Sequence, residues 1–167
     1  MYRVLIADDD ILMREALHVM IAKDSAFKVV SMTDTGERAV RVCKEDVIDI
    51  VFMDMQMPGI TGLEASRIIH QSNPEISIYI LSAHAANVLI RSAAQSQVKD
   101  VLEKPITYSC LKKIMENYKT EHEDSVQNQL EILASYLRNK DFGDFYDGIA
   151  GVIDEIYAIG GEDPVRL

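Results

Sequence analysis

The chain has 167 residues, 48% of them apolar, and a formal charge of −10. This composition supports a folded core and excludes an intrinsically disordered chain, and two widely separated cysteines, Cys43 and Cys110, exclude a disulfide scaffold. The longest apolar runs fall far short of the ~20 residues that span a bilayer, and the first residues carry no signal-peptide pattern. We therefore expect a cytoplasmic protein without membrane contact.

The negative charge is concentrated near the C-terminus. Residues 1–119 contain 14 Lys and Arg against 16 Asp and Glu, whereas residues 120–167 contain 3 against 11, which leaves −8 in the second segment. Affinity for nucleic acid depends largely on cationic contacts to phosphates. Residues 120–167 are therefore a poor DNA-binding surface, and any contact with DNA would require an output domain outside this chain.

Apolar runs and amphipathic stripes alternate along residues 4–118. Strands are predicted over 4–7, 27–32, 48–53, 76–81 and 98–102, and helices over 11–23, 36–44, 62–70, 86–96 and 107–118. Asp10 and Thr61 stand just before two of these helices and are interpreted as N-caps. The alternation with short connections predicts a doubly wound α/β fold with a five-stranded parallel sheet.

The segment after residue 118 has a different character. Residues 119–128 are almost wholly polar and form either a linker or the solvated middle of a long helix. Two apolar stripes follow, separated by turn-forming residues at 139–143, and they predict a helical hairpin over 125–160. We thus divide the chain into a domain over 1–119 and an acidic helical extension over 120–167.

The predicted strands deliver a set of chemically active side chains to one edge of the sheet. In a doubly wound sheet ligands bind beyond the carboxyl ends of the strands. Clustered carboxylates repel one another and favour a hard cation such as Mg²⁺, while an ammonium and a hydroxyl suit a phosphoryl group. A carboxylate so placed can attack phosphorus and form an aspartyl phosphate. The residues at this edge are Asp8, Asp9, Asp54, Ser82 and Lys104.

Four motifs at the strand ends resemble the receiver domain of two-component response regulators, in order and in spacing, over about residues 2–119. They are V-L-I-A-D-D-D at 4–10, D-M-Q-M-P-G-I-T-G at 54–62, L-S-A at 81–83 and K-P at 104–105. The resemblance implies a flavodoxin-like sheet. It also implies a signalling domain that takes a phosphoryl group from a sensor histidine kinase, catalyses that transfer and its own slow dephosphorylation, and is not otherwise an enzyme.

The resemblance assigns a role to each residue of the edge. Asp54 would be the phosphoacceptor and also a metal ligand. Ser82 would be the switch hydroxyl and Lys104 the partner of the phosphate. The remaining ligands of Mg²⁺ would be the carboxylates of Asp8 and Asp9 and the backbone carbonyl of Gln56.

Two positions depart from the family pattern and leave the output open. Val101 replaces the usual aromatic switch residue, and Gln97 replaces a common glycine. A degenerate receiver that acts only through protein contacts is therefore an alternative. An aspartyl-phosphate hydrolase of the dehalogenase type is a weaker one, because Gln56 stands where such enzymes place a second Asp. The extension loosely resembles the segment that follows the receiver in some AraC-type DNA-binding regulators, and it could also support a homodimer.

Overall fold

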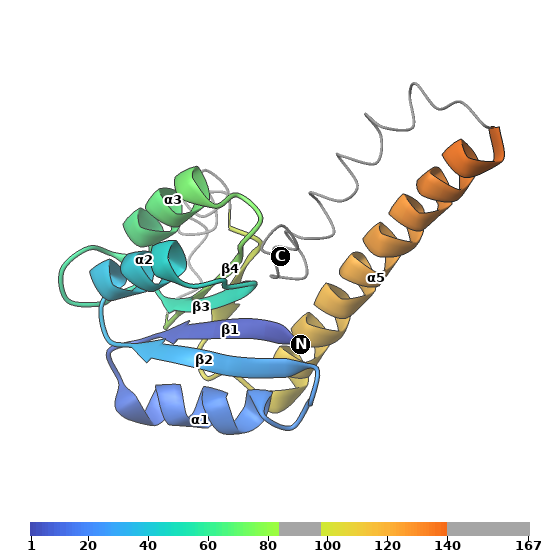
Figure 1. The fold of residues 1–167 in the computed structure, drawn as a ribbon. Helices are drawn as coiled ribbons and strands as arrows, with labels where there is room; N and C mark the ends of the chain where they lie inside the picture. Colours follow the sequence, from blue (N-terminus) through green and yellow to red (C-terminus); the bar gives the residue numbers. More distant parts are fainter. Residues whose placement is uncertain (84–97, 140–167) are drawn as a thin grey trace. The chain divides into compact units, whose positions relative to one another are not determined.

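The computed structural model describes residues 1–83 and 98–139 (Figure 1). The helix predicted over 86–96 and the second helix of the predicted hairpin lie outside the described residues. The chain divides into two compact units, Met1–Lys112 and Lys113–Leu167. This division and the predicted boundary at 119/120 both fall within one helix, α5, and the domain boundary stays a prediction.

The described residues form a five-stranded, all-parallel sheet with the strand order β2-β1-β3-β4-β5 (Figure 1). Each strand begins and ends within two residues of its predicted limits. The doubly wound, flavodoxin-like fold is thereby confirmed. The strands are β1 (Tyr2–Ala7), β2 (Phe27–Thr33), β3 (Ile50–Asp54), β4 (Ser77–Ser82) and β5 (Asp100–Glu103).

Helices cover both faces of the sheet, with α2 and α3 on one face and α1 on the other (Figure 1). The side chains of Asp10 and Thr61 accept hydrogen bonds from the first turns of α1 and α3, as predicted for N-caps. No helix in the described part of the chain has the length and apolar character needed to cross a membrane. The described helices are α1 (Ile11–Ile21), α2 (Gly36–Glu45), α3 (Gly62–Ser72) and α5 (Tyr108–Asn139).

Helix α5 decides between the two interpretations of residues 119–128. It continues without interruption to Asn139, so this polar segment is the middle of a long helix and the linker interpretation is wrong. The side chains of this segment that the structure describes are exposed or half-buried, in keeping with its polar composition, and good helix formers such as Glu, Lys and Gln maintain the helical backbone there.

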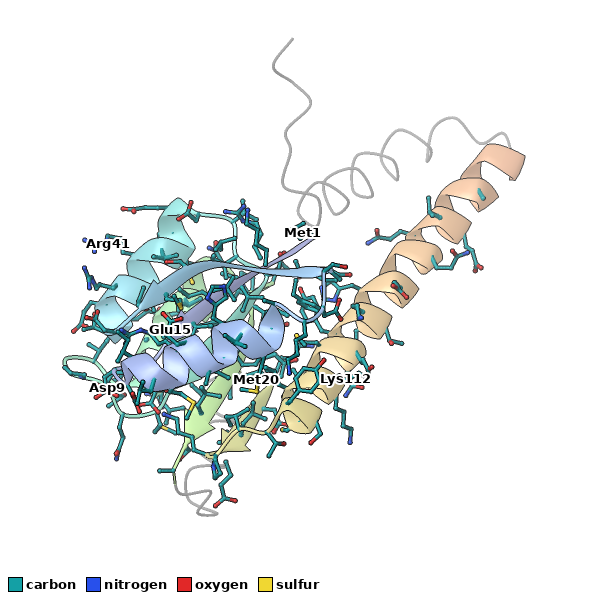
Figure 2. All side chains as sticks on the ribbon, turned by 90° about the horizontal axis from the view of Figure 1, so that it is seen from below. Met1, Asp9, Glu15, Met20, Arg41 and Lys112 are labelled. Carbon is teal, nitrogen blue, oxygen red and sulfur yellow. The ribbon has the colours of Figure 1, made fainter. Side chains whose placement is uncertain are left out.

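Complete burial of the central strands β3 and β4 explains why their sequences are nearly unbroken apolar runs. Every residue of β3 and β4 is buried, because each strand is covered by neighbouring strands at its edges and by other elements on its faces. On the face of α1, Leu17 and Ile21 are buried, and Figure 2 shows that helix in front of the sheet. The cluster on the other face joins the sheet to α2 and α3 through Leu5, Ala7, Val51, Met53, Ile78, Ile80, Ala39, Cys43, Ala65 and Ile69. This packing fixes the carboxyl ends of the strands relative to one another.

Candidate functional site

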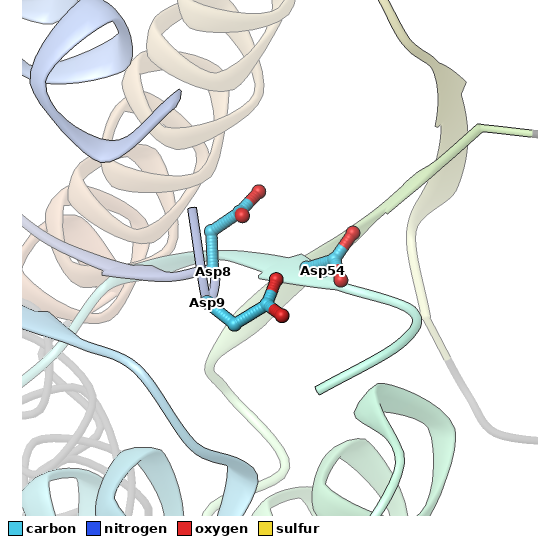
Figure 3. A group of neighbouring side chains, drawn as sticks. All are labelled: Asp8, Asp9 and Asp54. Atoms are coloured by element: carbon cyan, nitrogen blue, oxygen red, sulfur yellow. The ribbon is translucent and has the colours of Figure 1, made fainter. Parts of the chain in front are cut away.

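Three aspartates meet at the carboxyl ends of β1 and β3 (Figure 3). Ala7 pairs with Met53 in parallel register, so the residues that follow in each strand, Asp8 and Asp54, are neighbours. Oxygen atoms of Asp8, Asp9 and Asp54 lie within 4.8 Å of one another. Asp8 is fully buried, Asp54 is 6% exposed and Asp9 faces solvent. We call this group of three carboxylates, two of them buried and that of Asp9 exposed, the carboxylate pocket.

Lys104 supplies a positive charge to this pocket. Its Nζ lies 2.6 Å from Asp8 Oδ2 and 2.7 Å from Asp54 Oδ1. The end of β5 positions the residue, since the Lys104 amide donates to the carbonyl oxygen of Ser82 at 2.8 Å. The side chain of Ser82 is also buried, at the end of β4. The predicted convergence of Asp8, Asp54 and Lys104 is thus present, and Ser82 lies at the same edge.

The pKa values of the pocket follow from burial and pairing. Burial raises the pKa of Asp54, and the hydrogen bond and charge of Lys104 oppose that rise only in part. Burial by itself would lower the pKa of Lys104, but the hydrogen bonds to Asp54 and Asp8 and the negative charges of these two residues together outweigh burial, and the pKa of Lys104 is raised. Lys104 therefore remains a cation at neutral pH. One ammonium against three carboxylates leaves a negative excess, which favours binding of a second cation.

Main-chain and side-chain donors hold the two buried aspartates in place. The Asp10 amide donates to Asp8 Oδ1 at 2.9 Å, and the Gln56 amide donates to Asp54 Oδ2 at 2.9 Å. Arg14 of α1 donates from Nη1 to the Asp8 carbonyl at 2.6 Å. Asp10 uses its own side chain to cap α1, as expected, so its carboxylate is committed outside the pocket. Sequence reasoning did not identify Arg14, for which no motif gave a signal.

Gly62 is a second residue whose role the sequence did not reveal. The sequence indicates only that it begins a helix, but a β-carbon at this position would lie 2.1 Å from the carbonyl oxygen of Asp54. Its amide also donates to the carbonyl of Met55 at 3.1 Å. Glycine therefore allows the start of α3 to pack directly against the main chain of Asp54. Glycine at the first position of a helix, which usually favours other residues, was the available signal.

The donor set of the pocket fits Mg²⁺. This ion takes hard oxygen ligands in octahedral geometry, keeps several waters and uses one or two carboxylates together with substrate phosphate. The carboxylates of Asp8, Asp9 and Asp54 are close enough to share one ion, and the exposure of Asp9 leaves room for water. The residues present thus suit a hydrated divalent cation next to Asp54.

Comparison with known proteins identifies the family to which this geometry corresponds. The family model of the response regulator receiver domain matches residues 4–116. The response regulator UvrY of Escherichia coli K12 is 38% identical over 104 residues, which are 62% of this chain and 48% of UvrY. The response regulator GacA of Pseudomonas viridiflava is 41% identical over 78 residues, which are 47% of this chain and 36% of GacA. The chain thus spans about half the length, or less, of these curated relatives.

Solved structures agree with this result. The receiver domain of AraT, a response regulator from Geobacillus stearothermophilus, is 26% identical with a TM-score of 0.68, and the match covers 74% of this chain and 97% of that domain. A CheY-like receiver domain protein from Methanospirillum hungatei is 17% identical with a TM-score of 0.68, covering 74% of this chain and 98% of that one, which shows similarity of fold.

Proposed function

This chain belongs to the response regulator receiver domain family, and we propose that Asp54 is the residue on which it accepts a phosphoryl group. The observation that carries the proposal is the position of the Asp54 carboxylate, 2.7 Å from the Lys104 ammonium and beside the carboxylates of Asp8 and Asp9. A carboxylate oxygen of Asp54 would attack the phosphorus of a phosphohistidine on a sensor histidine kinase. The phosphorus–nitrogen bond breaks, the imidazole nitrogen leaves, and an aspartyl phosphate remains.

The neighbouring residues would each stabilise the transferred group. The Lys104 ammonium would pair with a phosphoryl oxygen, and the Ser82 hydroxyl would donate to another. Mg²⁺ would be held by the three carboxylates and the Gln56 backbone carbonyl, and when bound it would neutralise charge on the phosphoryl oxygens. Water that reaches the site from the exposed side of Asp9 would hydrolyse the product slowly, so the domain would reset itself without acting as an enzyme on other substrates.

We further propose that this domain relays its phosphorylation to a transcriptional output domain outside these residues. The chain spans about half the length, or less, of the curated relatives it matches, and one of these, from Brevibacillus brevis, is named the transcriptional regulatory protein DegU. Contact with DNA would occur only through that domain, and the sensor kinase would be met in the cytoplasm. An AraC-type output and a homodimer formed through residues 120–167 stay predictions.

Two alternatives make different demands on the site. A degenerate receiver would act through its surface without phosphorylation. Val101 favours this alternative, because it stands in place of the usual aromatic switch residue and packs against the apolar core cluster. A dehalogenase-type hydrolase would need an acid at position 56, which is Gln. The assembled group of Asp8, Asp54 and Lys104 favours phosphorylation. Burial of two carboxylates around one ammonium carries a desolvation penalty, and a domain that acts only through its surface does not need such a group.

The decisive experiment is labelling of the full chain with acetyl phosphate and Mg²⁺, followed by intact mass spectrometry. We expect one phosphoryl group per wild-type chain, none without Mg²⁺ and none in Asp54→Asn. Asp10→Asn is the matched control, since Asn also caps helices and residue 10 lies outside the pocket. It should be labelled like the wild type. Absence of labelling, or labelling that persists in Asp54→Asn, would refute the proposal, and multiple turnover on small phosphate esters would instead support a hydrolase.

A further inference from the structure

A contact between α2 and the loop that follows Asp54 connects two parts of the chain that no motif linked. Ile60 of the β3–α3 loop donates from its amide to Oε1 of Glu37 at 3.0 Å, across 23 residues of sequence. Gly59 has a φ of +84°, and a β-carbon there would lie 2.2 Å from the same Oε1. The Glu37 carboxylate is therefore pressed against the main chain of the loop.

The preceding residue of α2 completes this contact. A β-carbon on Gly36 would lie 2.7 Å from the Cγ1 atom and 2.8 Å from the carbonyl oxygen of Ile60. Glycine at 36 and 59 thus lets helix and loop approach more closely than side chains would permit. We call the group formed by Gly36, Glu37, Gly59 and Ile60 the α2 latch.

The latched loop carries main-chain groups of the candidate site. Its first part supplies the Gln56 amide, which donates to Asp54 Oδ2, and the Gln56 carbonyl, which is the proposed Mg²⁺ ligand. Its last residue, Thr61, is fixed by a capping box with Glu64, in which each side chain bonds the other residue's amide. At the start of the loop the Met55 amide donates to the carbonyl oxygen of Leu81 in β4, and nearer its end, in the described hydrogen bonds, Glu37 of α2 accepts from the Ile60 amide.

We propose that Glu37 is a positioning residue for Mg²⁺ binding: by bonding the Ile60 amide it holds the β3–α3 loop so that the Gln56 main chain is ready beside Asp54. This inference rests on the proposed function. A loop that is already ordered loses less conformational freedom when a ligand binds, so the latch raises affinity without touching the ion. Glu37 is exposed to solvent, so its hydrogen bond contributes little to global stability and its main effect is on the loop.

The test compares three variants of the full chain with the wild type. Glu37→Ala removes the acceptor, whereas Glu37→Gln keeps an acceptor oxygen and removes the charge. Arg38→Ala is the matched control, because Arg38 is the next exposed residue of α2 and its side chain pairs with Asp34, not with the β3–α3 loop. The measurements are amide hydrogen exchange at Ile60 in metal-free buffer, calorimetric titration with Mg²⁺ alone, and the Mg²⁺ dependence of labelling by acetyl phosphate.

We expect Glu37→Ala to speed exchange at Ile60 and to weaken Mg²⁺ binding by roughly three- to tenfold, the effect of one modest hydrogen bond. Labelling at saturating Mg²⁺ should stay within about twofold of the wild type, since the reacting groups are untouched. Glu37→Gln and Arg38→Ala should behave like the wild type. If Glu37→Ala does not fold, Glu37→Asp shortens the side chain by one methylene and should show the same loss.

Two results would overturn the inference. The first is unchanged Mg²⁺ affinity in Glu37→Ala, and the second is an equal loss in Glu37→Gln, which would assign the effect to charge. Failure of the proposed function has a different signature, because then the wild type itself forms no adduct on Asp54. Normal wild-type labelling with an unaffected Glu37→Ala variant would refute the positioning role alone.

Discussion

Replacement of Gly62 by Ala tests how closely the fold and the site depend on each other. Gly62 lies in the first turn of α3, where Ala would ordinarily be favoured by about 1 kcal/mol. The new β-carbon, however, would lie 2.1 Å from the carbonyl oxygen of Asp54, a main-chain atom that cannot rotate away, and it would have to move by more than an ångström. Because overpacking typically costs about 1–3 kcal/mol and the helical preference returns about 1 kcal/mol, we expect the free energy of unfolding to fall by up to about 2 kcal/mol.

The displacement should also lower the rate at which Asp54 is labelled by acetyl phosphate. A shift of Asp54 moves its carboxylate relative to Asp8 and Lys104, and a misplacement of about 1 Å lowers reaction rates by up to about 100-fold. Urea unfolding and the rate of labelling by acetyl phosphate measure the two effects. Ser72→Ala, at the exposed end of the same helix, is the control and should change stability by less than about 0.5 kcal/mol. A Gly62→Ala protein with wild-type stability and labelling rate would refute the reasoning.

Three further predictions concern Lys104 and the two cysteines. In metal-free buffer, Lys104→Met leaves the carboxylates of Asp8 and Asp54 without their shared ammonium. Urea unfolding should show that the free energy of unfolding falls by about 3–5 kcal/mol. A fall of less than about 1 kcal/mol would contradict this prediction. Burial raises the pKa of Cys43 to about 12. The unfolded chain therefore loses that thiol proton first, and stability should fall by roughly 1.4 kcal/mol per pH unit between about pH 9 and 12. Cys43→Ala should lack this slope. Parallel pH profiles of stability for the wild type and Cys43→Ala would contradict the prediction. Iodoacetamide should label the exposed Cys110 and spare Cys43 in the folded protein, as read by peptide mass spectrometry.

The central strands β3 and β4 could be predicted from the sequence because they are buried on both faces. Two-sided burial requires unbroken apolar runs, and each run ends abruptly at a polar residue, as at Asp8 and Asp54. The segment at 119–128 could not be decided in the same way. A solvated helix and a linker have the same polar composition, and only the backbone of α5 separates them.

The residues of the site could be predicted from the sequence, but the contacts that hold these residues in place could not. Strand ends in a parallel sheet converge by topology, so Asp8, Asp54 and Lys104 could be placed together without coordinates. Supporting contacts such as the one from Glu37 to Ile60 depend on how closely two elements approach. Such distances are set by packing across the whole domain, and neither periodicity nor residue type encodes them locally.

The geometry of Asp54 also indicates what the proposed phosphorylation would have to change. Its two oxygens are engaged by different donors, Oδ1 by the Lys104 ammonium and Oδ2 by the Gln56 amide. Each oxygen retains a second lone pair, so these bonds orient the carboxylate without blocking it. Once an oxygen is bonded to phosphorus it carries less negative charge, its attraction for Lys104 weakens, and the ammonium can follow the charge to the phosphoryl oxygens. That movement would release Asp8 from its 2.6 Å pair with Lys104. Phosphorylation of Asp54 would therefore also change the contacts of Asp8, at the end of β1, because both carboxylates share the Lys104 ammonium.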